Sequence, residues 1–123
     1  MSAKQPHEIH ALFLDAFNRG DVEALICLYE PHAILVTGDG SAVGHDAIRA
    51  AFRRFVSGGG RMQMVTRAIV DSGDGLAVLH GSWSLESGQD TISGLSTEVV
   101  RRQPDGSWLY VVDEPRTPED TAA

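Results

Sequence analysis

Two carboxylates stand out in the second half of the sequence because each interrupts a run of residues that favours β-strand. Glu98 lies within the apolar and β-branched run 96–100, and Asp113 closes the run 107–113. A carboxyl group that points into an apolar interior has a raised pKa, because burial disfavours its charged form. Such a group can donate a hydrogen bond to a ligand oxygen or act as a general acid or base. Glu98 and Asp113 are therefore the candidate catalytic residues.

Each of these acids also has a simpler interpretation. Glu98 could face a dimer interface and pair with Arg67 or Arg101, and Asp113 could cap the turn at the end of its strand. If both point inward from adjacent strands, they lie opposite or diagonal to each other, within about 5–8 Å. Repulsion would then raise one pKa and leave the other group ionised, which gives an acid/base pair.

The strand register decides between these interpretations. The turn at residues 103–106, Gln-Pro-Asp-Gly, favours a type I turn with a glycine bulge. That register places Glu98 opposite Val112, on the face of Trp108 and Tyr110, and turns Asp113 away. A slip of one residue moves a side chain to the other face of the sheet, so a shifted register would bring the two acids together.

Four of the five histidines and the single cysteine are predicted to be structural. His7 and His10 lack the i, i+4 spacing of a zinc-binding helix, so both are expected in a solvated first turn. His45 is expected at a helix N-terminus and His80 at a dimer face. Cys27 lies in an apolar run and is expected to be a small buried residue. Since no His, Cys or Asp cluster has ligand spacing, we predict no metal and no cofactor.

The elements that must position the acids follow from periodicity. Apolar residues at helical spacing predict a helix over 6–19, and shorter helices follow over 22–29 and 45–56. A short strand is expected at 33–37, with a turn at 38–41. Hairpin signals divide the remainder into four long strands. These are predicted at residues 61–71, 75–86, 91–102 and 107–114.

Helices followed by an antiparallel meander predict an α+β fold with the helices on one face of the sheet. The third and fourth long strands carry apolar residues on both faces, so neither face is typical of solvent exposure. A second copy of the sheet is the simplest cover for the face without helices. We therefore predict a homodimer formed sheet to sheet.

Composition limits the range of partners. The chain has 123 residues and a formal net charge of −7, which argues against a nucleic-acid or anionic-membrane partner. Residues 1–7 lack the apolar segment of a signal peptide, and one cysteine excludes an internal disulfide. The expected location is cytoplasmic.

Three segments stand out together, in this order. They are Phe17-Asn18-Arg19-Gly20-Asp21-Val22-Glu23-Ala24-Leu25 with Tyr29, Val43-Gly44-His45-Asp46-Ala47-Ile48, and Asp105-Gly106-Ser107-Trp108-Leu109-Tyr110-Val111-Val112-Asp113. They resemble stretches of SnoaL-like, ketosteroid isomerase-like proteins of the nuclear transport factor 2-like superfamily. The resemblance implies a cone-shaped fold, with three helices on a strongly curved antiparallel or mixed sheet around a pocket, and frequent dimers. One domain is expected over residues 1–115, and residues 116–123, which are polar and contain a proline, are expected to form a flexible tail. The resemblance also favours the register that turns Asp113 inward.

The resemblance does not imply one activity, because the family includes isomerases, cyclases, epoxide hydrolases, binding proteins and association domains. Carried over by position, the tyrosine of ketosteroid isomerase falls on Phe13 and its base on Thr37, whereas its protonated acid falls on Glu98. Two of the three groups are missing, so that activity is not expected. The epoxide hydrolases have an arginine where Ser96 stands, which argues against that activity too.

An apolar pocket suited to a small hydrophobic molecule is expected from the resemblance. Its predicted lining, besides the two acids, comprises Phe13, Phe17, His32, Thr37, Phe52, Met62, Met64, Trp83, Ser96 and Val111. Two functions remain open. One is a cofactor-independent acid/base enzyme of the isomerase, cyclase or hydrolase type, and the other is a non-catalytic module for small-molecule binding or dimerisation.

Overall fold

The computed structural model describes residues 2–117 and combines three α-helices with one six-stranded sheet. The helical elements are η1 (Pro6–Glu8), α1 (Ile9–Asn18), α2 (Val22–Ile26) and α3 (His45–Ser57). The strands are β1 (Tyr29–Thr37), β2 (Gly40–Val43), β3 (Arg61–Asp71), β4 (Leu76–Ser87), β5 (Asp90–Arg102) and β6 (Trp108–Arg116). The fold is therefore α+β, as predicted.

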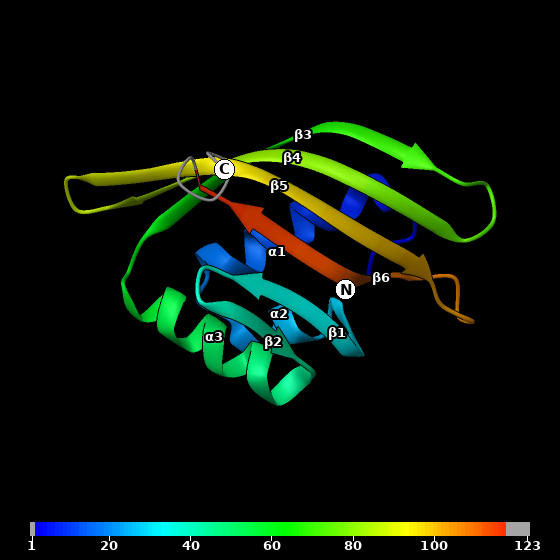
Figure 1. Ribbon diagram of the computed structural model, residues 1–123, viewed down its shortest axis with the longest axis horizontal. Helices are drawn as coiled ribbons and strands as arrows, with labels where there is room; N and C mark the ends of the chain where they lie inside the picture. Colours follow the sequence, from blue (N-terminus) through cyan, green and yellow to red (C-terminus); the bar gives the residue numbers. More distant parts are fainter. Residues whose placement is uncertain (1, 118–123) are drawn as a thin grey trace.

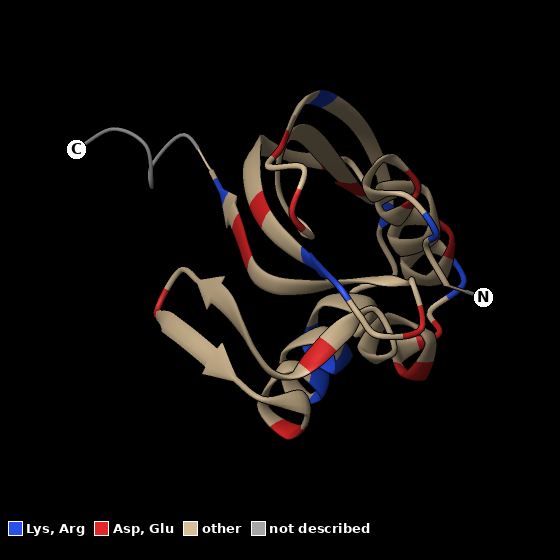
Figure 2. Cartoon of the chain, turned by 90° about the vertical axis from the view of Figure 1, so that its right-hand side faces the viewer, with Lys and Arg blue, Asp and Glu red and all other residues tan. Residues whose placement is uncertain are grey.

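The strand order is β2-β1-β6-β5-β4-β3. Only β1 and β6 pair in parallel, so the sheet is mixed. The long strands β3 to β6 sweep across the molecule, and β1, β2 and α3 lie together below them (Figure 1). Seen from the side, the strands bend strongly and the sheet does not close into a barrel (Figure 2).

The helices pack on the concave face through the apolar stripe that the sequence predicts. Ile9, Phe13 and Phe17 of α1 are buried, as are Ile48 and Phe52 of α3. The phenylalanine rings form one aromatic cluster with two tyrosines of the sheet, because Phe13 packs edge-on against Tyr110 and Phe52 contacts Tyr29. The candidate site lies against this aromatic cluster.

The second predicted helix, over residues 22–29, is shorter than expected. The Asp21 side chain accepts a hydrogen bond from the backbone N–H of Ala24 and so begins α2, but the helix ends at Ile26. Tyr29 is instead the first residue of β1, where it pairs with Tyr110 of β6. Pairing with β6 competes successfully with a helix that the sequence supports over only one or two turns.

Pro31, which follows the predicted helix, lies inside β1, where the pairing with β6 is interrupted and no N–H is needed. Two smaller predictions are also corrected. Cys27 is exposed because α2 turns Leu25 and Ile26 inward instead. The expected turn at 38–41 is tighter than predicted, and β2 follows it as a short edge strand. Of the predicted tail, residues 118–123 lie outside the described residues, and β6 runs through Arg116.

Candidate active site

A cavity of about 380 Å³ lies between the concave face of the sheet and the helices. This volume falls at the lower end of the range of about 300–1,000 Å³ that is usual for small-molecule sites. Most of its wall is aromatic or aliphatic. The lining residues are Phe13, Phe17, Leu35, Val36, Thr37, Gly38, Phe52, Phe55, Met62, Met64, Trp83, Leu85, Ile92, Ser96, Glu98, Tyr110, Asp113, Pro115 and Thr117.

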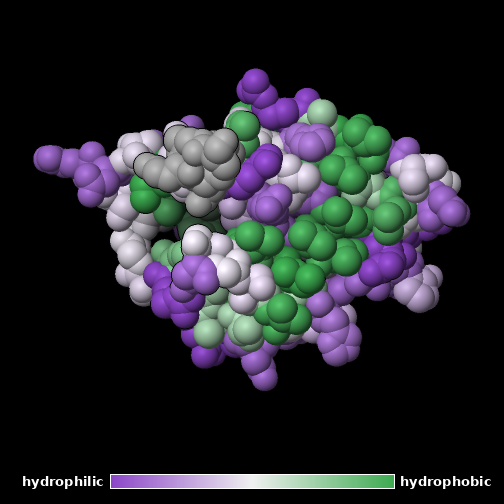
Figure 3. Space-filling view, viewed as in Figure 1, coloured by the Kyte–Doolittle hydropathy of each residue, from purple (hydrophilic) through white to green (hydrophobic). Residues whose placement is uncertain are grey.

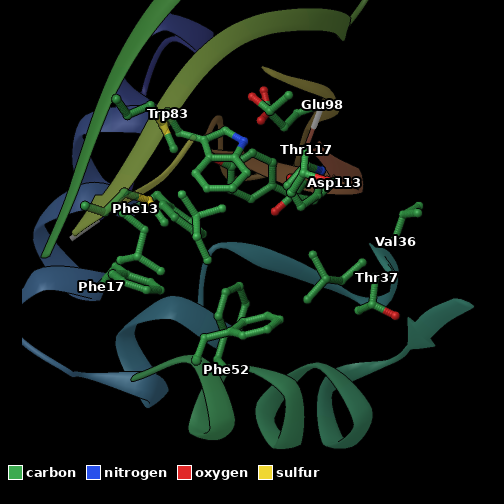
Figure 4. A pocket seen from close by; sticks show the side chains of 18 of the residues that line it. Phe13, Phe17, Val36, Thr37, Phe52, Trp83, Glu98, Asp113 and Thr117 are labelled. Carbon is green, nitrogen blue, oxygen red and sulfur yellow. The ribbon is translucent and has the colours of Figure 1, made fainter. Parts of the chain in front are cut away.

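Glu98 and Asp113 meet in this cavity from neighbouring strands. They are direct partners in the β5–β6 register, and their exposed fractions are only 2% and 6%. Figure 4 shows both side chains on one side of the cavity, with Phe17 and Phe52 on another. The cavity therefore has a polar end formed by the two acids and an aromatic end formed mainly by α1 and α3.

A β-bulge brings the two acids together. Near the hairpin, Arg102 pairs with Trp108 and Val100 with Tyr110, which is the register that the turn sequence favours. The register then shifts by one residue between Val99 and Val100, and the extra residue on β6 is Val111. Beyond the bulge, Glu98 faces Asp113. Both the turn-based and the family-based register are thus present, on either side of one extra residue.

Asp113 is the acid whose protonation the surroundings change most. Burial, reinforced by the negative charge of Glu98, raises its pKa from 3.8 to about 8. The Tyr29 hydroxyl donates a hydrogen bond of 2.5 Å to Oδ2, which opposes this rise but does not cancel it. At neutral pH the Asp113 carboxyl group is therefore mainly protonated and can donate a hydrogen bond into the cavity.

Glu98 has a different partner. Its Oε1 lies 2.7 Å from Nε2 of His10, and Nδ1 of His10 lies 2.7 Å from the Thr66 hydroxyl. His10 is buried, so the prediction that it lies in a solvated first turn is wrong. The reason is its spacing to Phe13 and Phe17, three and seven residues on, which places it on the inner side of α1. The alternative pairing of Glu98 with Arg101 does not occur, because Arg101 binds Glu30.

Two hydroxyl groups complete the polar end. Tyr110 is buried beside the acids, and its pKa is raised well above the usual value by burial and by the charges of Glu98 and Asp113. The Ser96 hydroxyl is buried on the same wall and has no hydrogen-bond partner among the described residues. This hydroxyl is available to donate to, or accept from, a polar group of a ligand.

Most of the predicted lining residues do line the cavity, but His32 and Val111 do not. His32 is exposed because Ala33 and Leu35 take the inward positions of β1, and Val111 occupies the bulge. The sequence analysis missed four polar residues of the site. These are His10, Tyr29, Thr66 and Tyr110.

Nothing among residues 2–117 suggests a resident metal, since no three His, Cys, Asp or Glu side chains are grouped closely enough to hold one. In the same part of the chain, no helix is both long and apolar enough to cross a membrane.

The sequence matches the model of a known family. A model of the SnoaL-like domain matches residues 10–111, so the chain belongs to the SnoaL-like domain family. A comparison with curated proteins gives no significant match.

Solved structures share the fold at low sequence identity. An NTF-2 like protein of unknown function from Shewanella oneidensis is 23% identical, with 89% of this chain and 93% of that chain covered and a TM-score of 0.79. A ketosteroid isomerase-like protein from Erwinia carotovora is 20% identical, with 91% and 94% covered and a TM-score of 0.72. A protein from Xanthomonas campestris, provisionally named a calcium/calmodulin-dependent protein kinase II association domain, is 18% identical, with 92% and 86% covered and a TM-score of 0.80. At these identities the similarity establishes the fold alone.

Proposed function

We propose that this protein is a cofactor-independent acid/base enzyme of the isomerase, cyclase or hydrolase type that acts on a small hydrophobic substrate. The observation that carries the proposal is the direct pairing of two buried carboxyl groups, Glu98 and Asp113, in an otherwise apolar cavity. Burial of two carboxyl groups side by side is costly, and such a pair is seldom retained without a function.

The two acids have complementary roles in this proposal. Glu98, as the carboxylate, removes a proton from a substrate carbon or from a water molecule. Asp113, as the neutral acid, donates its proton to the substrate oxygen on which negative charge develops. In an isomerisation, Glu98 then gives its proton to another substrate carbon and the substrate oxygen returns its proton to Asp113. In a hydrolysis, the proton that Glu98 took from water passes to Asp113. In both cases the enzyme is restored and no external acid or base is consumed.

The charge of the wall favours an uncharged substrate. None of the described residues that line the cavity is Lys or Arg, whereas Glu98 and Asp113 are both acids. A carboxylate or phosphate would lie beside the negative charge of Glu98 with no cation to offset it. A neutral molecule with an apolar body and one oxygen at the polar end meets the cavity best.

Acid/base activity can be tested with two small apolar probes before the natural substrate is known. Exchange of the α-protons of 2-indanone in D₂O, followed by NMR, reports abstraction next to a carbonyl group, and hydrolysis of styrene oxide reports water activation. We expect the protein to accelerate at least one of these reactions. Glu98→Gln and Asp113→Asn should each lower that rate about 10²- to 10⁴-fold.

Glu114→Gln is the matched control, because Glu114 lies next to Asp113 on β6 but pairs with Thr97 on the other face of the sheet. Its rate should equal that of the wild type. Equal rates in all four proteins would overturn the acid/base assignment.

A non-catalytic binding module is the second candidate. It is favoured by Phe13 and Thr37, which lack the functional groups of ketosteroid isomerase at those positions. Binding of 2-indanone in the cavity without any proton exchange or turnover of either probe would support this candidate over the first.

We also propose a homodimer through the convex face of the sheet. A row of directly paired aliphatic side chains crosses all six strands on this face. The row consists of Val43, Ile34, Val112, Val99, Val78 and Val70. Figure 3 shows the apolar surface that results, and Val43 and Val70 are 59% and 61% exposed. The name of the Xanthomonas protein, an association domain, is consistent with assembly in this fold.

The dimer is tested by sedimentation equilibrium of Val99→Lys, which places a charge at the centre of the row. We expect the dissociation constant to rise by about 100-fold, because two charges per dimer lose their hydration. Thr91→Lys, at the exposed start of β5, is the control and should leave it unchanged. A wild-type protein that stays monomeric at high concentration would overturn the proposal.

A cytoplasmic location stays a prediction.

A further inference from the structure

Glu98 and Asp113 face the same cavity and differ mainly in the groups behind them. Tyr29 of β1 donates a hydroxyl hydrogen bond to Asp113, whereas His10 of α1 lies against Glu98. We infer that His10 is a positioning residue that keeps Glu98 ionised and thereby leaves the exchangeable proton of the pair on Asp113. This inference deepens the proposed acid/base function and rests on it for its catalytic meaning.

The contact between His10 and Glu98 is buried and short. The two side chains are 5% and 3% exposed, and Nε2 lies 2.7 Å from Oε1. A ring nitrogen that donates to a carboxylate at this distance forms a charge-assisted hydrogen bond, which is about twice as strong as one between neutral groups. An Nε2–H donor at this distance therefore stabilises the carboxylate form of Glu98.

Thr66 on β3 contacts the other ring nitrogen of His10. Its hydroxyl lies 2.7 Å from Nδ1 of His10 and can donate to that nitrogen. A neutral imidazole that accepts at Nδ1 carries its hydrogen on Nε2, directed at Glu98. The chain from Thr66 through His10 to Glu98 is then satisfied at every atom with Glu98 in its ionised form.

The sheet leaves room for the His10 ring at a position where any residue larger than glycine would displace its neighbours. A Cβ atom built on Gly81 of β4 would lie 3.2 Å from Cε1 of His10, 2.9 Å from the Ser96 hydroxyl and 3.3 Å from the Val65 carbonyl. The ring is thus held between α1 and β4. It cannot turn away from Glu98 without breaking both of its hydrogen bonds.

The hydrogen-bond partner of Glu98 among the described residues is His10. Asp113 and Tyr110 of β6 and Tyr29 of β1 are the titratable groups whose charges couple to that of Glu98, and all three are neutral or anionic. Among the described residues that line the cavity, Lys and Arg are absent. The group that favours the carboxylate form of Glu98 is therefore His10.

The experiment is a side-chain carbon NMR titration of both carboxyl groups, without ligand, in the wild type and three variants. In the wild type, Asp113 should titrate near pH 8. In His10→Phe, Glu98 loses its donor and should take the proton, so the titration midpoint of Asp113 should fall by about two pH units. His10→Gln can still donate an amide N–H and should restore most of the wild-type value. Thr66→Val should produce a smaller fall than His10→Phe.

Imidazole nitrogen shifts give a second readout that needs no variant to fold. In the wild type at pH 7, the His10 hydrogen should be found on Nε2. An Nδ1–H tautomer beside a protonated Glu98 would overturn the inference. So would an Asp113 midpoint that is unchanged in His10→Phe, because a merely structural histidine would lower stability without moving the proton between acids.

The titration and the activity assay fail independently. Relocation of the proton in His10→Phe, with no wild-type turnover of either probe, would uphold the role of His10 and reject the enzyme. Turnover that depends on Glu98 and Asp113, with no relocation, would uphold the enzyme and reject the role of His10.

Discussion

The two faces of the sheet distribute polarity in an unusual way. On the concave face, Glu98 and Asp113 are almost fully buried, and each has a hydrogen-bond partner from another element. On the convex face, the aliphatic row from Val43 to Val70 remains partly or largely exposed. The buried face thus holds charge, while the exposed face holds hydrocarbon. The difference is consistent with the proposed small-molecule site on the concave face and the proposed dimer interface on the convex face.

The largest expected contrast is between neighbouring residues of β4. Leu79 is fully buried on the concave face, and Val78 lies on the convex face. Leu79→Ala should lower the free energy of unfolding by about 2–5 kcal/mol, because it leaves a cavity in the core. Val78→Ala should lower it by less than about 1 kcal/mol at concentrations where the protein is monomeric. Urea denaturation measures both values, and similar losses would remove the distinction between the faces.

The pH dependence of stability sharpens the comparison, because it reports the buried acid directly. The pKa of Asp113 is raised from 3.8 to about 8 in the folded protein. The folded state therefore keeps a proton that the unfolded chain releases above about pH 4. The stability from this proton is fully present below pH 4 and is lost as the pH rises through 8.

The wild type should accordingly lose stability relative to Asp113→Asn by about 1.4 kcal/mol per pH unit between pH 5 and pH 7.5. Urea denaturation of both proteins at several pH values measures this difference, and the carboxyl groups that do not interact with Asp113 cancel in it. Parallel stability curves would contradict the raised pKa.

The smallest expected effect concerns a close approach on the concave face. Gly81→Ala forces its new Cβ against Ser96 and His10, so it should cost about 1–3 kcal/mol and weaken the contact between His10 and Glu98. Ser82→Ala, one residue on and on the convex face, should change stability by no more than about 0.5 kcal/mol. Thermal unfolding compares the two, and a Gly81→Ala protein as stable as the wild type would show that the ring has room to move.

The sequence predicts the long strands well because their signals are local. Each run of alternating residues is bounded by a glycine-containing turn, and the observed strands β3 to β6 differ from the predicted ranges by one or two residues at most. Tyr29 and β2 could not be found in this way. Tyr29 joins β1 through pairing with β6, which lies some eighty residues further along the chain, and local propensity carries no information about that pairing.

The site is predictable only in part for the same reason. Glu98 and Asp113 attract attention because an acid in an apolar strand is unusual, whereas His10 looks like an ordinary polar residue near a helix start. Its helical spacing to Phe13 and Phe17 was the available signal. The contact with Glu98 joins residues 88 positions apart and depends on how α1 lies across the sheet. Such a contact requires the packed structure.

The extra residue on β6, Val111, lets the two halves of this strand pair differently with β5. It decouples the hairpin from the cavity wall, since the turn at residues 103–106 can follow its own preferred geometry while the far end of β6 follows another. If Val111 were instead paired regularly with Val99, the residues after it would change faces, with Val112 opposite Glu98 and Asp113 on the convex side. The polarity of the interior therefore depends on one unpaired residue that itself does not line the cavity.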